Sequence, residues 1–231
     1  MKIAIRGEGP ADMGVSYYAD SLKKGPMIIL IENLDCYQQL SHILRNNKEA
    51  IEWIYIHKTD IKGSSENRKK MILRGKKQHR KESDYEKGIL KGFYSNSESF
   101  ACLAKERGAD IAIFFIDRDN DSNETRYKQI KLGLKQGEYD ATGIPMMPVK
   151  TSEAWLMCCL SKYQNCAKHE RATTDKTSPD YPKNVCKASG YTQQQIAEEC
   201  DPNKIDMSSF NRFKEDLRRA INAYLGYEVC N

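Results

Sequence analysis

The sequence has no long apolar run. No window approaches the roughly 18 apolar residues that a membrane span needs, and its start lacks the charged and apolar regions of an export signal. Histidine is scarce, and the four that occur, His42, His57, His79 and His169, form no pattern typical of a metal cluster or a catalytic triad. We therefore expect a cytoplasmic, soluble protein without a membrane partner, and 231 residues suit a single globular unit.

The eight cysteines show no paired motif. A disulfide framework is typical of short secreted chains, and here the spacings are irregular and no export signal is present, so we expect reduced thiols. Cys166 and His169, with Cys158, Cys159 and Cys186 nearby, are the only candidates for a zinc site. No second pair completes that site, which favours buried or idle thiols.

The net charge of +5 is local. Between residues 68 and 81 there are eight basic residues and no acidic one: Arg68, Lys69, Lys70, Arg74, Lys76, Lys77, Arg80 and Lys81. Removing these eight from the 37 basic residues leaves 29 against 32 acidic residues, a net charge of −3. The window is suited to contact with nucleic-acid phosphates, although a solvated face or a basic loop has the same composition.

Short apolar runs predict four strands, at residues 3–6, 53–57, 111–116 and 143–149, and the prolines of the last indicate an edge or a strand end. Apolar periodicity and capping signals predict helices over residues 15–24, 27–46, 95–107, 154–163 and 208–225, with a strand over 27–31 as an alternative. Residues 58–93 and 173–182 are expected to be loops, the first with short helical pieces. The polar stretch from 122 to 142 is assigned no element.

Alternation of strands and helices predicts an α/β fold with a mainly parallel sheet flanked by helices. We expect residues 1–160 to form the core and to carry a basic insertion at about 58–93. Residues 161–231 are expected to form a helical C-terminal extension packed on that core. Ligands of such a sheet collect beyond the carboxyl ends of its strands.

Carboxylates follow three of the expected strands. Glu8 and Asp12 lie in a glycine-flanked turn after the first strand, Asp117 and Asp119 follow the apolar run at 111–116, and Glu153 begins a helix with Ser152 as its N-cap. Asp117, Asp119 and Asp121 project to one side in an extended chain. This supply of oxygen ligands predicts a Mg²⁺ site, with Mn²⁺ as a substitute.

Two other interpretations of the aspartate run are weaker. An EF-hand loop needs glycine where Ser122 stands and a bidentate glutamate where Lys128 stands. A solvated turn explains the aspartates alone, but it does not account for Glu8 and Glu153.

The acidic segments resemble the Toprim domain of primases, type II topoisomerases and nucleases of the overcoming-lysogenization-defect group. Glu8 and Asp12 match the family's Glu-x-x-x-Asp element, Asp117 and Asp119 match its Asp-x-Asp element, and Glu153 matches its downstream glutamate. The stretch from Pro148 to Leu156 is similar to stand-alone bacterial Toprim-like proteins, and a later Ser-Phe-x-x-Phe pattern is matched by Ser209, Phe210 and Phe213. The chain departs from the best-known nucleases at Lys150, where they carry serine, and its basic insertion has no counterpart.

The resemblance implies a Toprim-like fold and a Mg²⁺-dependent nuclease that hydrolyses phosphodiester bonds of DNA or RNA. Asp117 and Asp119 hold one ion in this scheme, Asp12 and Glu153 support a second, and Glu8 acts as a ligand or as the general base. Lys150 stabilises charge on the transferring phosphoryl group, or is an ordinary surface lysine. A role as an anti-phage or abortive-infection effector, controlled by a partner ATPase or regulatory protein, rests on the resemblance alone.

A second hypothesis is a non-catalytic regulatory subunit that binds nucleic acid or a nucleotide through the same acidic cleft and basic insertion. A third, weaker one is a phosphoacceptor domain that uses Asp117. Asp119→Ala distinguishes the nuclease from the regulatory subunit. In a nuclease it removes activity but leaves nucleic-acid binding, whereas in a regulatory subunit it leaves the biological function largely unchanged.

Overall fold

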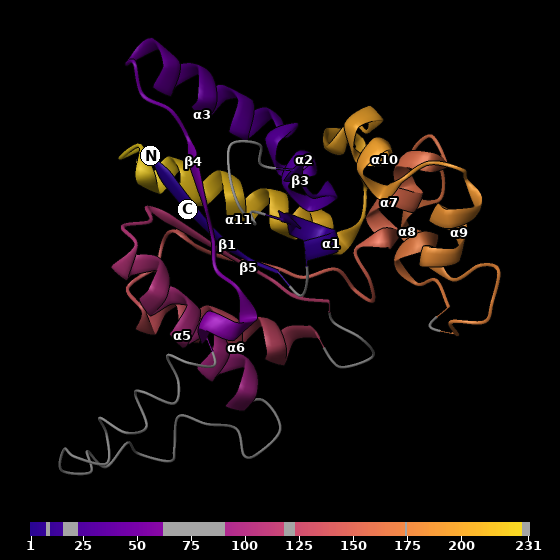
Figure 1. The fold of residues 1–231 in the computed structure, drawn as a ribbon, viewed down its shortest axis with the longest axis horizontal. Helices are drawn as coiled ribbons and strands as arrows, with labels where there is room; N and C mark the ends of the chain where they lie inside the picture. The colour runs from indigo at the N-terminus through magenta and orange to yellow at the C-terminus, as the bar shows by residue number, and fades with distance from the viewer. Residues whose placement is uncertain (8–9, 16–22, 62–90, 118–122, 174, 228–231) are drawn as a thin grey trace.

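The computed structural model describes residues 1–7, 10–15, 23–61, 91–117, 123–173 and 175–227 (Figure 1). The expected basic insertion lies largely outside these residues, and its eight basic residues lie wholly outside them. None of the helices in the described ranges combines the length and the apolar character that a bilayer crossing requires.

A four-stranded, all-parallel sheet forms the centre of the molecule, which confirms the expected α/β fold. Its order is β4-β1-β5-β6, formed by Glu52–Tyr55, Lys2–Arg6, Ile111–Phe115 and Gly143–Met146. Strands β1 and β5 pair from Ile3 with Ile111 to Arg6 with Phe114. Strand β6 is an edge strand, as its prolines predict.

Helices cover both faces of the sheet, because successive side chains of a strand point to opposite sides. One face carries Ile3, Ile5, Ile113 and Phe115 and packs against α2 (Pro26–Glu32), α3 (Asp35–Asn46) and α11 (Ser208–Tyr224). The other face carries Ala4, Ala112 and Phe114 and packs against α5 (Lys91–Glu106) and α6 (Asn123–Gln136). The central strand β5 is therefore buried along its whole length.

Several sequence predictions of local structure are wrong. The ends of the helix expected over 15–24 belong to a small antiparallel pair, β2 (Gly14–Val15) and β3 (Lys23–Lys24). The helix expected over 27–46 is divided into α2 and α3, because Leu34 is extended between them. No strand forms at 27–31, where five apolar residues of α2 are buried on all sides.

Helix α6 was not expected, because its sequence is mostly polar and charged and only a few apolar residues mark its buried side. Ile130 and Leu134 supply the buried contacts. Gly133 lies against Ser97 and Tyr94 of α5 so closely that a Cβ atom there would overlap them. Close helix packing, rather than propensity, thus explains this element.

The chain after β6 forms a helical unit at one end of the sheet (Figure 1). It contains α7 (Glu153–Leu160), α8 (Cys166–Glu170), α9 (Pro182–Ala188) and α10 (Gln193–Glu199). The sequence predicts α7 individually and the other three only as parts of a helical extension. Two disulfides, Cys158–Cys166 and Cys159–Cys200, join α7 to α8 and to the end of α10. The expectation of reduced thiols is wrong for these four cysteines, which also removes Cys158, Cys159 and Cys166 from a zinc site.

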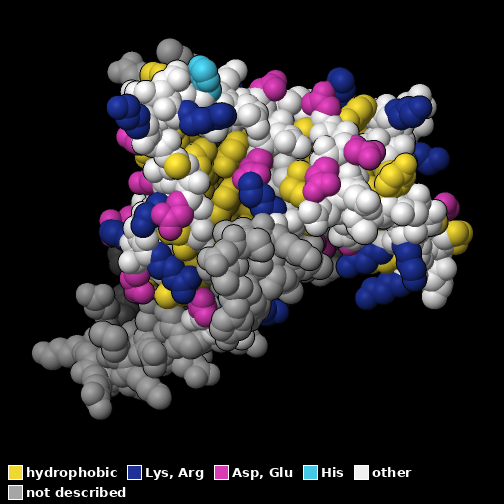
Figure 2. All heavy atoms as spheres, turned by 45° about the horizontal axis from the view of Figure 1, so that its top comes forward, with side chains coloured by type: hydrophobic (Ala, Val, Ile, Leu, Met, Phe, Trp, Pro, Cys, Tyr) yellow, Lys and Arg dark blue, Asp and Glu magenta, His cyan; other side chains and the backbone are white. Residues whose placement is uncertain are grey.

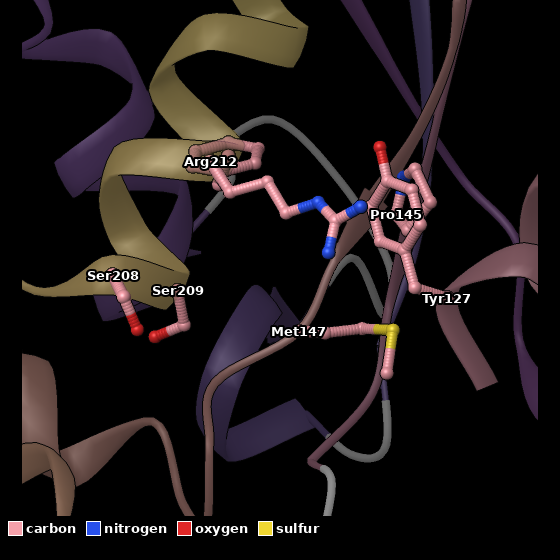
Figure 3. A pocket seen from close by; sticks show the side chains of 7 residues that line it. Tyr127, Pro145, Met147, Ser208, Ser209 and Arg212 are labelled. Carbon is pink, nitrogen blue, oxygen red and sulfur yellow. The ribbon is translucent and has the colours of Figure 1, made fainter. Parts of the chain in front are cut away.

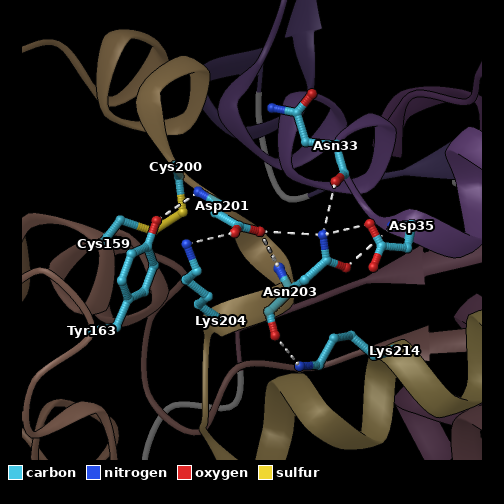
Figure 4. Close-up of polar contacts among 9 residues, drawn as sticks. All are labelled: Asn33, Asp35, Cys159, Tyr163, Cys200, Asp201, Asn203, Lys204 and Lys214. Atoms are coloured by element: carbon cyan, nitrogen blue, oxygen red, sulfur yellow. Dashed lines mark hydrogen bonds and ion pairs between the residues drawn. A yellow bond between two sulfur atoms is a disulfide. The ribbon is translucent and has the colours of Figure 1, made fainter.

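The helical unit is tied to the core through Asn203 (Figure 4). Its side-chain amide donates to the carbonyl of Asn33 (3.3 Å) and to Asp35 (3.0 Å), and its oxygen accepts from the amide of Asp35 (3.1 Å). Lys214 of α11 donates to the carbonyl of Asn203 at 3.2 Å. The contacts with Asn33 and Asp35 connect residues about 170 positions apart in the chain, and the Cys159–Cys200 disulfide lies beside them.

The Cys159–Cys200 disulfide should contribute strongly to stability. It joins cysteines 41 positions apart, and restriction of the unfolded chain by a loop of that length is worth roughly 4 kcal/mol in the chain-entropy model. We expect Cys159→Ser, or reduction, to lower the Tm, and Cys102→Ser to leave it nearly unchanged because Cys102 is a free cysteine. Thermal unfolding with and without reductant, and peptide mapping of unreduced protein, test this; equal Tm values would contradict it.

Candidate functional site

The carboxyl ends of β1, β5 and β6 lie side by side at one edge of the parallel sheet. The amide of Ile116 donates to the carbonyl of Met146 at 3.1 Å, which extends the β5–β6 pairing one step toward Asp117. The segments that follow these strands therefore meet at one edge, as expected for an open parallel sheet. Asp12, Asp117 and Glu153 all lie in such segments.

Ser152 links two of the predicted ligands. Its hydroxyl donates to Asp12 Oδ1 at 3.2 Å, and its backbone amide donates to Asp117 Oδ1 at 3.1 Å. The sequence predicts Ser152 as the N-cap of the following helix, and it holds that position, but its side chain makes no capping hydrogen bond. The serine instead holds carboxylates that are 105 positions apart in the chain.

Asp12 is positioned by close backbone packing. It lies in the short helix α1 (Pro10–Met13), directly after β1. Gly25 packs against the backbone of Asp12 and Gly14 so tightly that a Cβ atom would overlap it. Met13, 4% exposed, anchors the turn in the core.

Glu153 is a buried carboxylate, only 3% exposed, in the first turn of α7. Its Oε1 accepts from Gln193 Nε2 at 3.0 Å and lies 3.5 Å from Lys183 Nζ. Its Oε2 is buried and has no hydrogen-bond partner among the described residues. A buried carboxylate oxygen without a partner is costly, so this atom is a candidate for binding a further cation or donor.

Lys183 is the cation that faces these carboxylates. Its pKa is raised from the ordinary value because Glu153 stabilises the ammonium, with a further contribution from Asp117. Lys183 and Gln193 were missed by the sequence analysis. They lie on α9 and α10, which no motif identifies and which only the tertiary fold brings to Glu153.

Arg6 places a second positive charge at this edge. It ends β1, is 4% exposed, and donates to the carbonyl of Phe115 at 3.5 Å. Its guanidinium lies 4.6 Å from the ring centroid of Phe114. Arg6 pairs with Phe114, so this buried cation lies on the strand next to β5, three residues before Asp117.

The ammonium of Lys150 contacts the backbone. It donates to the carbonyls of Arg171, at 3.1 Å, and Ala172, and so joins the β6–α7 connection to the end of α8. Glu8 and Asp119 lie outside the described residues, as does the run from Arg68 to Lys81. Within the described ranges, no group of three or more His, Cys, Asp or Glu side chains has the spacing of a metal site.

The fold and the site define a class: parallel α/β proteins with carboxylates gathered at the carboxyl ends of neighbouring strands. Comparison of the chain with protein-family models, curated proteins and solved structures finds no match.

The ion pair between Lys183 and Glu153 can be tested directly. Glu153→Gln should lower the pKa of Lys183, because it removes the charge that stabilises the ammonium most. Following the Lys183 side-chain NMR signals as the pH rises measures this change. Glu199→Gln, at an exposed position at the end of α10, is the matched control and should leave the titration as it is. If the pKa of Lys183 is the same in Glu153→Gln as in wild type, the two side chains do not form an ion pair in solution.

Proposed function

We propose that the protein is a Mg²⁺-dependent, Toprim-like nuclease that hydrolyses phosphodiester bonds of DNA or RNA. The observation that carries the proposal is the link from Ser152 to both Asp12 and Asp117, with the unpartnered, buried oxygen of Glu153 one residue further on. These are the described carboxylates that match the Toprim elements. The resemblance of Glu8 and Asp119 to the same elements supports it further.

The described residues suit a divalent cation with oxygen ligands. Mg²⁺ is usually held by one or two carboxylates, with waters and substrate oxygens completing its shell, so a group of three protein ligands is not required. Asp117, with Asp119, would hold one ion, and Asp12 and Glu153 would support a second. A bound ion supplies positive charge against the phosphate oxygens.

The chain's own groups have separate roles in this proposal. Glu8 serves as a ligand or takes the proton of the attacking water. Ser152 orients Asp12 and Asp117, and Gln193 orients Glu153. The ammonium of Lys150 supports the loop after β6 through two carbonyls, which suits a positioning role better than direct contact with the phosphoryl group.

Basic side chains near the site support a nucleic-acid substrate. Figure 2 shows Lys and Arg side chains gathered at the end of the molecule that the C-terminal helices form. The exposed basic residues of segment 162–187 are Lys162, Lys168, Arg171, Lys176, Lys183 and Lys187. Together with the run from Arg68 to Lys81, they offer contacts for a phosphate backbone. Control by a partner ATPase or regulatory protein, and a role as an anti-phage or abortive-infection effector, are parts of the proposal that rest on the resemblance.

A second candidate is a non-catalytic subunit that binds nucleic acid or a nucleotide. The ion pair between Lys183 and Glu153 favours it, because this ammonium already neutralises a carboxylate of the site. In this alternative the acidic edge is a structural ion-pair cluster, and the basic surface alone carries the function.

Cleavage assays decide between the two candidates. Plasmid DNA, single-stranded DNA and total RNA are incubated with wild type, Glu8→Ala and Asp119→Ala, each with Mg²⁺ or Mn²⁺. We expect metal-dependent cleavage by wild type and a loss of more than about 100-fold in both variants, since even outer-shell changes cost 10–100-fold. Asp140→Ala is the matched control, because Asp140 lies before β6, at the opposite end of that strand, and pairs only with Lys135 among the described residues.

Nucleic-acid binding is measured on the same variants. If the Asp119→Ala variant binds nucleic acid but does not cleave it, the result supports the nuclease proposal. Intact substrates with every protein, combined with tight binding, would favour the second candidate.

Cation binding has a readout that does not depend on activity. A ligand at 100 times its Kd stabilises the folded state by about 2.7 kcal/mol, so saturating Mg²⁺ should raise the Tm of wild type. The rise should be smaller in Asp117→Asn and in Glu153→Gln, and unchanged in Asp140→Asn. An equal rise in all four proteins would show that the cation binds elsewhere.

A further inference from the structure

A pocket of about 140 Å³ lies beside the edge strand β6, between α6 and α11 (Figure 3). Its apolar walls are Pro145, Met147 and Phe213, and the ring of Tyr127 closes one side. Engineered apolar cavities of about 150 Å³ bind benzene, so this volume admits one six-membered ring. The pocket contains none of the carboxylates assigned to the candidate site.

The polar side of the pocket offers one donor and one acceptor next to each other. Ser209 Oγ accepts from the indole of Trp155 at 3.1 Å, and its own proton has no acceptor among the described residues. Ser208 Oγ donates its proton to Glu170 at 2.9 Å, which leaves its lone pairs available. The two serines are consecutive residues at the start of α11, and Figure 3 shows both hydroxyls pointing in the same direction. This pattern is complementary to the adjacent donors and acceptors on the edge of a nucleobase.

Arg212 gives the pocket a planar cation. Its guanidinium lies 3.5 Å from the ring centroid of Tyr127 and donates to Glu124 at 2.9 and 3.4 Å. The contact with Glu124 joins α11 to the first turn of α6 across the pocket. Guanidinium groups and apolar or aromatic walls are the surfaces on which bases stack.

The charges around the pocket favour a neutral ligand over a phosphate. Glu124 neutralises Arg212, Glu170 accepts from the amides of Ser208 and Ser209, and Asp216 accepts from the hydroxyl of Tyr127 at 2.5 Å. Burial and this last bond raise the pKa of Tyr127, so the hydroxyl stays protonated. Lys131 of α6 donates to the carbonyl of Gly143. Arg212 and Lys131 are thus already engaged with protein acceptors, and the carboxylates beside them are unfavourable for an anion.

The pocket adjoins the acidic edge. Met147 directly follows β6, and Asp117 directly follows Ile116. Because the amide of Ile116 donates to the carbonyl of Met146, Met147 and Asp117 leave the sheet on adjacent strands. A base bound in the pocket can therefore direct its sugar and phosphate toward the carboxylates. We propose that this pocket binds a nucleobase, supplied by a nucleic-acid strand or by a free nucleotide. The inference rests on the proposed function, because it names the part of the substrate that lies beside the reacting phosphate.

Trp155 is a built-in reporter for this pocket. Its indole N–H contacts Ser209, and the chain has only two tryptophans, so Trp53→Phe assigns the two indole NMR signals. The probes are CMP, UMP, AMP and GMP, with ribose 5-phosphate as the ligand that lacks a base, all in EDTA so that no divalent cation contributes. We expect a saturable shift of the Trp155 signal with nucleotides and none with ribose 5-phosphate.

Substitutions locate the base. Arg212→Ala should weaken nucleotide binding about 10-fold, the scale of a lost stacking contact. The matched control is Arg218→Ala, which removes an ion-paired arginine of the same helix that lies outside the pocket lining and should have no effect. Ser209→Ala is a second variant, and comparison of the Tm values identifies any loss of folding. An equal response to ribose 5-phosphate, or binding that Arg212→Ala and Ser209→Ala leave unchanged, would overturn the inference.

Short oligonucleotides of DNA and RNA form a second arm of the test. Tighter binding than by mononucleotides, with the same Trp155 shift, supports a base within a strand, whereas a shift with mononucleotides alone supports a base pocket for a free nucleotide. Cleavage without any base-dependent shift of the Trp155 signal would overturn the proposal of base binding in the pocket but not the proposal of a nuclease. A base-dependent shift without cleavage would support the pocket and count against the nuclease.

Discussion

The parallel pairing of β1, β5 and β6 is the constraint on which the rest of the structure depends. Parallel strands that pair in register end at the same edge, so the three segments that follow them meet. Ser152 then connects Asp12 with Asp117, although these residues come from opposite parts of the core sequence. A shift of one residue in this register would move every side chain of the shifted strand to the other face of the sheet and separate these groups.

The C-terminal helical unit adds rigid support to that edge. Glu153 is held by residues of α9 and α10. The Cys159–Cys200 disulfide joins the end of α10 to α7, and Asn203, shortly after it, is bonded to the core. Glu170 accepts from the amides of Ser208 and Ser209 and so fixes the start of α11, whose buried aromatic residues pack against Trp155. A buried carboxylate keeps one position only when its neighbours are fixed in this way. Stability and site geometry are therefore linked through the same few contacts.

Charge balance distinguishes the functions that we propose. At the acidic edge Lys183 neutralises one oxygen of Glu153 and leaves the other without a partner among the described residues, an arrangement suited to a second cation. In the pocket beside β6, Glu124 already neutralises Arg212, an arrangement suited to an uncharged ring. A nucleotide would join both chemistries in one molecule: in our proposal its phosphate lies at the acidic edge and its base in the pocket.

The sequence by itself determined the sheet, the final helix and the grouping of acidic residues after strands. These features depend on short-range apolar patterns: five consecutive buried residues in β5, and Phe210, Phe213 and Leu217 on one face of α11. Only the tertiary structure decided the division between α2 and α3, the existence of α6, the disulfides and the partners of Glu153. Each of these depends on contacts between distant residues, as when Gly133 fits against α5 or Gln193 reaches Glu153, and local propensity carries no information about such contacts.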